Sequence, residues 1–188
     1  QDLWLIFTRR GIDIDGYPAV KAHLQAFRKQ LEAKPDAWDD KTQGAWPGRK
    51  AGSYEWFHIQ DNIAYWEEFL LPKIIVPAIA ATPMAAVDQT GYFSNNKSTI
   101  FLPPSAALAA ACVNSAIAAW LAVQTFSTKQ GGFFDFEPRY SGQIPIPRAS
   151  SDQIAVIECI VIAVTAGINR PEYERLLNGL VYELFFPE

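Results

Sequence analysis

Hydrophobic and polar positions along the chain alternate in short segments that predict a mixture of strands and helices. Short apolar runs rich in β-branched and aromatic residues and bounded by Gly, Pro or Asn are typical of strands. The runs with this pattern are Trp4–Phe7, Lys73–Val76, Ser98–Leu102 and Ile144–Pro147. The Gly131-Gly132 pair, followed by a cluster of phenylalanines, instead indicates a flexible and then aromatic loop.

Helical spacing of apolar residues, with start and stop signals, predicts the helices. Pro18 suits a first helical position, and the apolar positions from Val20 to Leu31 form one stripe of an amphipathic helix that ends before Pro35. Ser105 is an expected N-cap for an Ala-rich helix, which is apolar on nearly all sides and therefore belongs in the interior.

The C-terminal part is predicted to form two further helices. Ser150 and Gln153 have the spacing of a capping box, and Gly167 is expected to stop the helix that they open. Pro171 is expected to open the last helix, whose inward positions would be Leu176, Leu177, Leu180 and Leu184. The order predicts an α+β fold with a mixed β-sheet flanked by helices and ending in two C-terminal helices. We expect residues 150–188 to pack on residues 1–149 as one structural unit.

Composition is that of an ordinary globular domain, with 188 residues of which 49% are hydrophobic and 19% charged. Cys112 and Cys159 lie far apart in apolar runs, so we expect both to be reduced core residues of a cytoplasmic protein. The longest apolar stretches are interrupted by polar residues or are too short to span a membrane, which favours buried helices. The start at Gln1, without a signal peptide, suggests a fragment of a longer protein.

Charge is unevenly distributed. Residues 1–150 hold 14 Lys and Arg against 14 Asp and Glu, and residues 151–188 hold 2 against 6, which together give the 16 and 20 of the chain. The net charge of −4 is therefore a property of the C-terminal segment. A neutral body can still present a basic face, and the pairs Arg9-Arg10, Arg28-Lys29 and Arg49-Lys50 show local basic density.

Catalytic motifs are missing from the sequence. The chain has two His, no nucleophile elbow, no phosphate-binding Gly-rich loop and no dinucleotide fingerprint. The Asp13 and Asp15 pair before Gly16 is more typical of a turn than of a metal site. We therefore expect this fragment not to be an enzyme by itself.

The most informative stretch is 48–61, which combines two cations, flexible glycines, three aromatic residues and Gln60. These residue types pair with phosphates, approach a nucleic-acid backbone closely and read base edges. The alternative is that Trp56 and Phe57 belong to the core and that Arg49 and Lys50 only face solvent. Composition alone leaves both interpretations open.

Several motifs, taken in order, closely resemble the TaqI-like C-terminal specificity domain, the target recognition part of adenine-specific DNA methyltransferases and of fused type II restriction-modification enzymes. The resemblance covers nearly the whole chain. Its motifs are 5–18, Gly48-Arg49-Lys50 through Trp56, Ile59-Gln60-Asp61, Phe69 with Pro72–Ile75, Gly91-Tyr92-Phe93 as a strand, Val113-Asn114-Ser115 as a helix, Gln143–Pro147 as a closing strand, and 180–188. The Ala-rich stretch departs from the larger aliphatic residues usual in the family.

The resemblance implies a DNA target recognition domain over residues 1–149, with the helices of 150–188 packed on it. It implies that the parent protein transfers a methyl group from S-adenosylmethionine to an adenine, and that any cleavage by the parent would use Mg²⁺. The partners implied are double-stranded DNA and a catalytic methyltransferase domain of the same polypeptide, with no membrane. The DNA contacts that we expect are Arg49, Lys50, Gln60, Lys73, Lys97, Lys129 and Arg139. The alternative function is a protein-interaction module that does not touch DNA.

Overall fold

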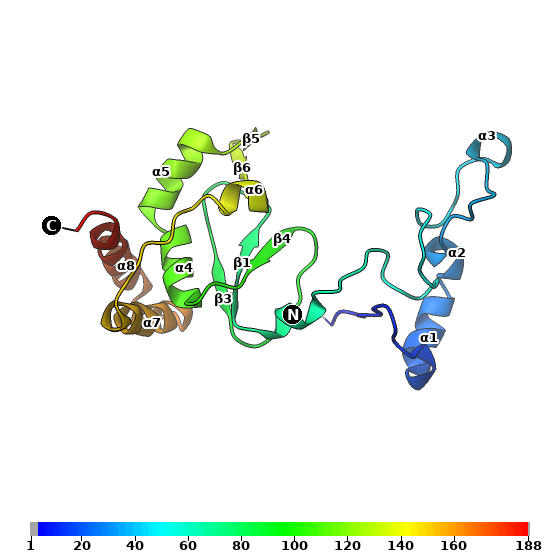
Figure 1. Cartoon of the computed structure of the whole chain (residues 1–188), viewed down its shortest axis with the longest axis horizontal. Helices are drawn as coiled ribbons and strands as arrows, with labels where there is room; N and C mark the ends of the chain where they lie inside the picture. Colours follow the sequence, from blue (N-terminus) through cyan, green and yellow to red (C-terminus); the bar gives the residue numbers. More distant parts are fainter. Residues whose placement is uncertain (1–3, 188) are drawn as a thin grey trace. The chain divides into compact units, whose positions relative to one another are not determined.

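The computed structural model describes residues 4–187 and divides the chain into two compact units, 1–65 and 66–188. Both are seen in Figure 1. We call them the first unit and the second unit. The α+β class expected from the sequence is confirmed, because helices and two small antiparallel sheets occur together. The domain boundary drawn at residue 149 stays a prediction.

The first unit contains three short α-helices and long connecting segments. Its elements are the 3-10 helix η1 Ile14–Gly16 and the helices α1 Pro18–Gln25, α2 Arg28–Leu31 and α3 Asp40–Gln43. Pro18 begins α1 as expected, but the single amphipathic helix is interrupted at Ala26 and Phe27, and neither α1 nor α2 has a fully buried residue. The strand predicted at Trp4–Phe7 is not formed, and Trp4 is 94% exposed.

The second unit contains both sheets and the longer helices. Its elements are the 3-10 helix η2 Trp66–Leu70, the strands β1 Lys73–Pro77, β2 Ile79–Ala80, β3 Ala86–Asp88, β4 Ser98–Phe101, β5 Thr128–Lys129 and β6 Phe133–Asp135, and the helices α4 Ala106–Val113, α5 Ala116–Thr125, α6 Pro138–Ser141, α7 Ser151–Thr165 and α8 Arg170–Phe185. One sheet has the order β3-β1-β4 and the other β2-β6-β5.

The strands β1 and β4 confirm two of the strand predictions. They pair antiparallel with Ile75 opposite Ile100, and the β-branched residues of β1 put Ile74 and Val76 into the core. The other expectations for strands fail. Ile144–Pro147 and Gly91–Phe93 have no ladder partners, whereas the expected aromatic loop pairs as the β5–β6 hairpin. Two prolines in Ile144–Pro147 remove the N–H groups that a strand needs.

The helix α4 lies at the centre of the second unit. Ser105 caps it as expected, accepting the N–H of Leu108 at 3.2 Å. One side of α4 packs on the sheet core through Ala109, Ala110 and Val113, and the other packs on α7 and α8 through Leu108 and Cys112. Small alanines allow this close approach on both sides, so the Ala-rich composition of α4 has a packing reason.

The Ala-rich segment forms two helices, not one. The helices α4 and α5 meet at an angle of 59°, and Ser115 caps α5 by accepting the N–H of Ala118. Asn114 holds the break by donating to the carbonyls of Ala110 and Ala85. Among the described helices, no single one is both long and apolar enough to cross a membrane, and only this bent pair satisfies the length and composition together.

The C-terminal helices follow their sequence signals closely. The capping box of Ser150 and Gln153 is present, and Gly167 adopts a φ of +75° directly after α7. Pro171 lies in the first turn of α8. The expected inward positions of α8 pack on the core except for Leu176, which is exposed. Residue 188, the end of the motif 180–188, lies outside the described residues.

Candidate nucleic-acid interface

Arg49 is the centre of the first unit's informative stretch. Its guanidinium donates from Nε to the carbonyl of Leu31 at 2.6 Å, from Nη1 to that of His58 at 2.6 Å, and from Nη2 to that of Trp56 at 2.8 Å. It also lies over the ring of Tyr54, 4.6 Å from the centroid. A guanidinium used in this way joins α2 to the segment 54–58 and contributes to the fold of the unit.

Arg10 binds the same segment from the N-terminal side. It donates to the carbonyls of Ile59 and Gln60, and its guanidinium lies 5.2 Å from the centroid of the Tyr54 ring. Burial, together with the nearby charges of Arg10 and Arg49, lowers the pKa of His58. The sequence identified Arg10 only as part of a basic pair.

Lys50 and Gln60 make fewer side-chain contacts within the fold than Arg49, and Lys50 is exposed. Lys50 forms an exposed ion pair with Asp61 at 2.8 Å, and its hydrogen bond lowers the pKa of that carboxyl. Gln60 is half-buried, and its main-chain carbonyl accepts from Arg10 at 2.9 Å. Any phosphate that approached Lys50 would compete with Asp61.

Gly48 allows the chain to pass close to α2. A Cβ at this position would lie 2.4 Å from the carbonyl oxygen of Glu32 and 2.5 Å from Nε1 of Trp46. The same Glu32 carbonyl accepts the N–H of Arg49 at 2.9 Å, next to the isolated bridge between Ala33 and Arg49. Glycine is therefore required here for a close approach of two backbones.

We expect Gly48→Ala to destabilise the first unit by about 1–3 kcal/mol, because the new methyl group overlaps backbone that cannot move without breaking the bridge. Gly16→Ala is the matched control, since no atom lies within 4 Å of a Cβ placed there. Urea unfolding of both variants measures the difference. Equal midpoints for the two variants would contradict this account of Gly48.

Lys73 lies in the core of the second unit. Its side chain is 0% exposed and forms an ion pair with Asp88, and its ammonium also donates to the carbonyl of Phe69. Burial by itself raises the pKa of Asp88, but hydrogen bonds from Lys73, Thr90 and the N–H of Tyr92 outweigh it, so that the pKa is below its ordinary value. This corrects the expectation that Lys73 presents its charge to DNA, because in this structure the charge does not reach the surface.

Lys129 and Arg139 meet at one buried carboxylate. Lys129 Nζ lies 3.1 Å from Oδ2 of Asp135, and Arg139 Nη2 lies 3.0 Å from the same oxygen. A backbone hydrogen bond from Glu137 is the main reason that the pKa of Asp135 is lowered. The carboxylate thus holds two cations side by side while their side chains stay partly exposed to solvent.

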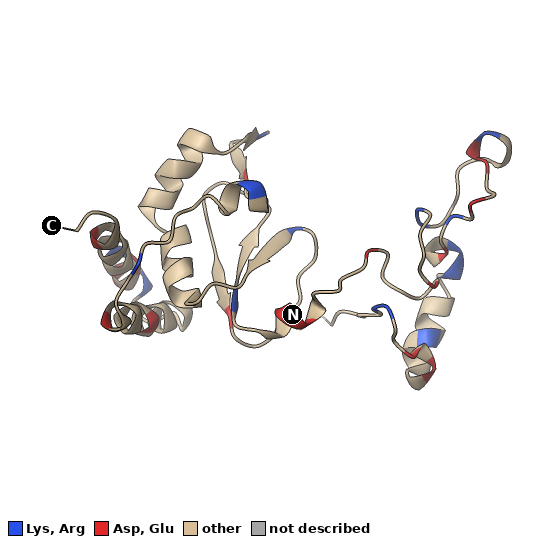
Figure 2. Ribbon diagram, viewed as in Figure 1, with Lys and Arg blue, Asp and Glu red and all other residues tan. Residues whose placement is uncertain are grey.

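Lys97 joins this group through the backbone of Ala78. The N–H of Ala78 donates to the carbonyl of Lys97, and its own carbonyl accepts the N–H of Phe136, both at 2.8 Å. Phe136 directly follows Asp135. We call Lys97, Lys129 and Arg139 the basic junction, because all three lie around the place where the two sheets of the second unit meet. Figure 2 shows Lys and Arg at the start of β4 and on α6, and Asp and Glu on α7 and α8.

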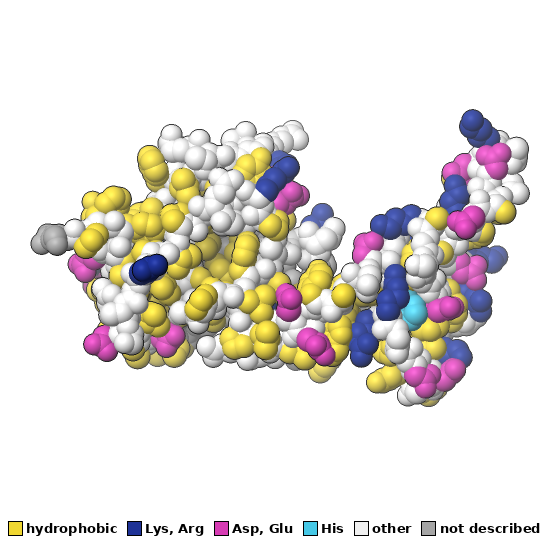
Figure 3. All heavy atoms as spheres, in the orientation of Figure 1, with side chains coloured by type: hydrophobic (Ala, Val, Ile, Leu, Met, Phe, Trp, Pro, Cys, Tyr) yellow, Lys and Arg dark blue, Asp and Glu magenta, His cyan; other side chains and the backbone are white. Residues whose placement is uncertain are grey.

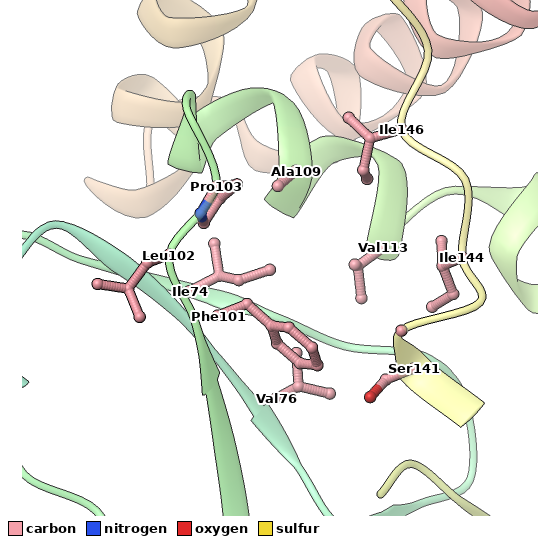
Figure 4. Close-up of a pocket in the computed structure, with 11 residues that line it drawn as sticks. Ile74, Val76, Phe101, Leu102, Pro103, Ala109, Val113, Ser141, Ile144 and Ile146 are labelled. Atoms are coloured by element: carbon pink, nitrogen blue, oxygen red, sulfur yellow. The ribbon is translucent and has the colours of Figure 1, made fainter. Parts of the chain in front are cut away.

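An apolar pocket of about 250 Å³ lies between β1, β4, α4 and the segment after α6. Its walls include Ile74, Phe101, Val113 and Ile144, and Figure 4 shows their side chains converging on it. The hydroxyl of Ser141 reaches the same wall but donates to the carbonyl of Phe136 at 2.9 Å. The pocket therefore offers packing surface and no reactive group of its own.

Among residues 4–187, no group of three His, Cys, Asp or Glu side chains is arranged to hold a metal ion. The sequence did not identify Asp88 or Asp135, which organise the cations of the second unit. A signal was present in each case, since an acidic residue ends both β3 and β6 after apolar positions. Their partners lie on other segments, and only the folded chain identifies them.

No model of a known family matches the chain, and no curated protein matches its sequence. The resemblance to the TaqI-like specificity domain therefore rests on the motifs themselves.

Proposed function

We propose that this chain is the DNA sequence-recognition part of a restriction-modification enzyme, an N6-adenine methyltransferase or endonuclease of type II. The motifs that resemble the TaqI-like specificity domain support the proposal, and so does the distribution of charge on the second unit. Methyl transfer from S-adenosylmethionine would be carried out by a catalytic methyltransferase domain of the same cytoplasmic polypeptide. The role of this chain would be to hold duplex DNA and to select its sequence.

The basic junction is the observation that carries the proposal. Its three cations come from separate segments, the end of the connection between β3 and β4, β5 and α6, which meet around Ala78 and Asp135 although the chain as a whole is acidic. Five of the ten acidic residues described in the second unit lie on α7 and α8, where Arg170 and Arg175 are paired with glutamates. Lys129 and Arg139 are paired with Asp135, and Arg139 also with Glu137, but their side chains are 42% and 64% exposed. A local group of cations that is still open to solvent attracts the phosphate backbone.

In this proposal the cations position DNA and do not read it. Lys97, Lys129 and Arg139 would contact phosphates, and Lys50 in the first unit would do so when it leaves Asp61. Arg49 would act indirectly, since its guanidinium donors hold the segment that carries Gln60. Lys73 has no direct part, because its ammonium is paired in the core.

Substitution at the basic junction tests the proposal. We expect Lys97→Gln to weaken binding to duplexes of any sequence and to reduce the slope of log K against log salt by about 0.9, which is the loss of one phosphate contact. The control is Arg175→Gln, which removes the same charge from α8 and should leave the slope unchanged. Fluorescence anisotropy with a random-sequence duplex measures both. A slope that changes equally in the two variants would show that the junction has no special role.

Binding of a partner protein is the second candidate function, because α5 has an exposed apolar face. Trp120 is 65% exposed and Val123, almost one turn further on, is 63% exposed. Figure 3 shows hydrophobic side chains over much of the visible face of the second unit. Exposed apolar surface of this kind is typical of interaction sites. The anisotropy experiment distinguishes the two functions, because a module of this class would not bind duplex DNA.

A further inference from the structure

The connection between β3 and β4, residues 89–97, has to travel along the whole length of its sheet. β3 and β4 both run antiparallel to β1, so they are parallel to each other. β3 ends at Asp88 opposite Lys73, and β4 begins at Ser98 opposite Pro77, which is the other end of β1. Figure 1 shows the connection on the side of this sheet away from α4. The segment is therefore an extended surface element.

The start of this connection is fixed by the buried ion pair. The carboxylate of Asp88 accepts the N–H and the hydroxyl of Thr90, each at 2.8 Å, and the N–H of Tyr92 at 2.8 Å. Lys73 neutralises that carboxylate from inside the sheet. Gly91 adopts a φ of +84°, which turns the chain between these two bonds. The conformation of the first residues is thus set by the core.

The middle and the end of the connection are also held. The ring of Phe93 stacks on that of Phe69, with centroids 4.9 Å apart and planes 13° from parallel. Oδ1 of Asn95 accepts the N–H of Lys97 at 2.9 Å, and the carbonyl of Lys97 accepts from Ala78. A surface segment anchored at three points loses little conformational entropy when it binds a ligand.

The exposed side chains of the connection have the chemistry that reads DNA bases. Between residues 89 and 97 there is no Asp or Glu, and the one charge is that of Lys97. The exposed residues are Gln89, Thr90, Tyr92, Asn95, Asn96 and Lys97. Amides of Asn and Gln pair with adenine edges, and Tyr92, which is 71% exposed, offers a ring for stacking and a hydroxyl for phosphate.

We propose that residues 89–97 are the sequence-reading element of this chain, which places the amide of Asn96 and its neighbours against base edges while the adjacent basic junction holds the phosphates. This inference rests on the proposed function and makes it specific. The connection begins at the buried ion pair of Lys73 and Asp88 and ends at Lys97 of the basic junction. In the first unit, by contrast, the cations Arg10 and Arg49 are bonded to backbone carbonyls.

Photo-crosslinking locates the element directly. Tyr92 is replaced by the photoreactive aromatic residue benzoylphenylalanine in the whole chain, and the protein is irradiated with a random-sequence duplex pool. The control carries the same residue at Tyr182, which is also exposed but lies on α8. We expect DNA crosslinks from position 92 and none above background from position 182. Crosslinks from position 182 alone, or no crosslinks from position 92 while DNA is bound, would overturn the inference about residues 89–97. Either result would leave the proposed function, DNA binding, unaffected.

Selection of a preferred DNA sequence distinguishes residues that contact bases from residues that contact phosphates. A duplex enriched from the random pool by the wild-type chain should bind Asn96→Ala about 5- to 150-fold more weakly, with little change for a scrambled duplex, because one bidentate contact is worth that much. Gln124→Ala on α5 is the control and should behave as wild type. An unchanged ratio of selected to scrambled binding in Asn96→Ala would overturn the role of Asn96 in reading. If the wild-type chain binds no duplex at low salt, the proposed function itself fails.

Discussion

Asp88→Ala is expected to destabilise the second unit by about 3–5 kcal/mol, because it leaves the ammonium of Lys73 buried without a counter-charge. The substitution also removes the acceptor for the N–H groups of Thr90 and Tyr92. Urea unfolding followed by hydrogen exchange of β1 peptides measures the loss in the second unit separately from the first. The expected result is a large fall in protection of β1.

The double variant Lys73→Met, Asp88→Leu is the control for the charge argument. Replacing both partners by apolar residues of similar size removes the uncompensated charge, so most of the lost stability should return. The loop bonds to Asp88 would still be missing, and the double variant should therefore remain somewhat less stable than wild type. A single variant that loses less than about 1 kcal/mol would contradict the buried pair.

Arg49→Met is expected to destabilise the first unit by about 2–4 kcal/mol, because three carbonyls on two segments lose a charged donor. Methionine keeps the apolar stem but removes the guanidinium that lies over the ring of Tyr54. The unfolding of the first unit is followed by hydrogen exchange of peptides from 31–58. We expect Arg49→Lys to recover less than half of the loss, because one ammonium lacks the planar fork of donors that reaches all three carbonyls.

Lys50→Met is the matched control, since it is the same change of charge at the adjacent position. Its ion pair with Asp61 is exposed, so we expect a change within about 0.5 kcal/mol. Comparison of the two variants thus tests whether Arg49 stabilises the fold while Lys50, at the surface, does not. If Arg49→Met kept full stability but weakened binding to DNA, Arg49 would be a phosphate contact instead.

The parts of the fold that the sequence predicted are those fixed by local chemistry. Ser105, the Ser150 and Gln153 box, Pro171 and Gly167 act within one helical turn, and each was found at its expected helix end. The strand at Ile144–Pro147 fails because of its own prolines, but the failure at Trp4–Phe7 depends on a distant partner. An apolar run such as Trp4–Phe7 forms a strand only if another strand pairs with it, and the chain provides none for it among the described residues.

In the candidate site, too, residue types could be predicted from the sequence, but contacts with distant segments could not. The stretch 48–61 was recognised from its residue types, but the role of Arg49 is set by carbonyls of two other segments. Lys73 before an apolar strand has the appearance of a surface cation, and its burial becomes evident only when β3 brings Asp88 beside it. Lys97, Lys129 and Arg139 were expected separately. The i,i+4 spacing of Asp135 and Arg139 is visible in the sequence, but the positions of Lys97 and Lys129 depend on Ala78 and on the β5–β6 hairpin, which only the folded chain reveals.

The salt dependence of duplex binding by the wild-type chain tests the central claim most directly. With the three cations of the basic junction on phosphates, the slope of log K against log salt should be about −2.7, with a dissociation constant in the range of about 10⁻⁴ to 10⁻⁶ M for random sequence. Fluorescence anisotropy over a series of salt concentrations gives both quantities. A chain that binds no duplex DNA at low ionic strength, or binds it with no dependence on salt, would contradict the claim.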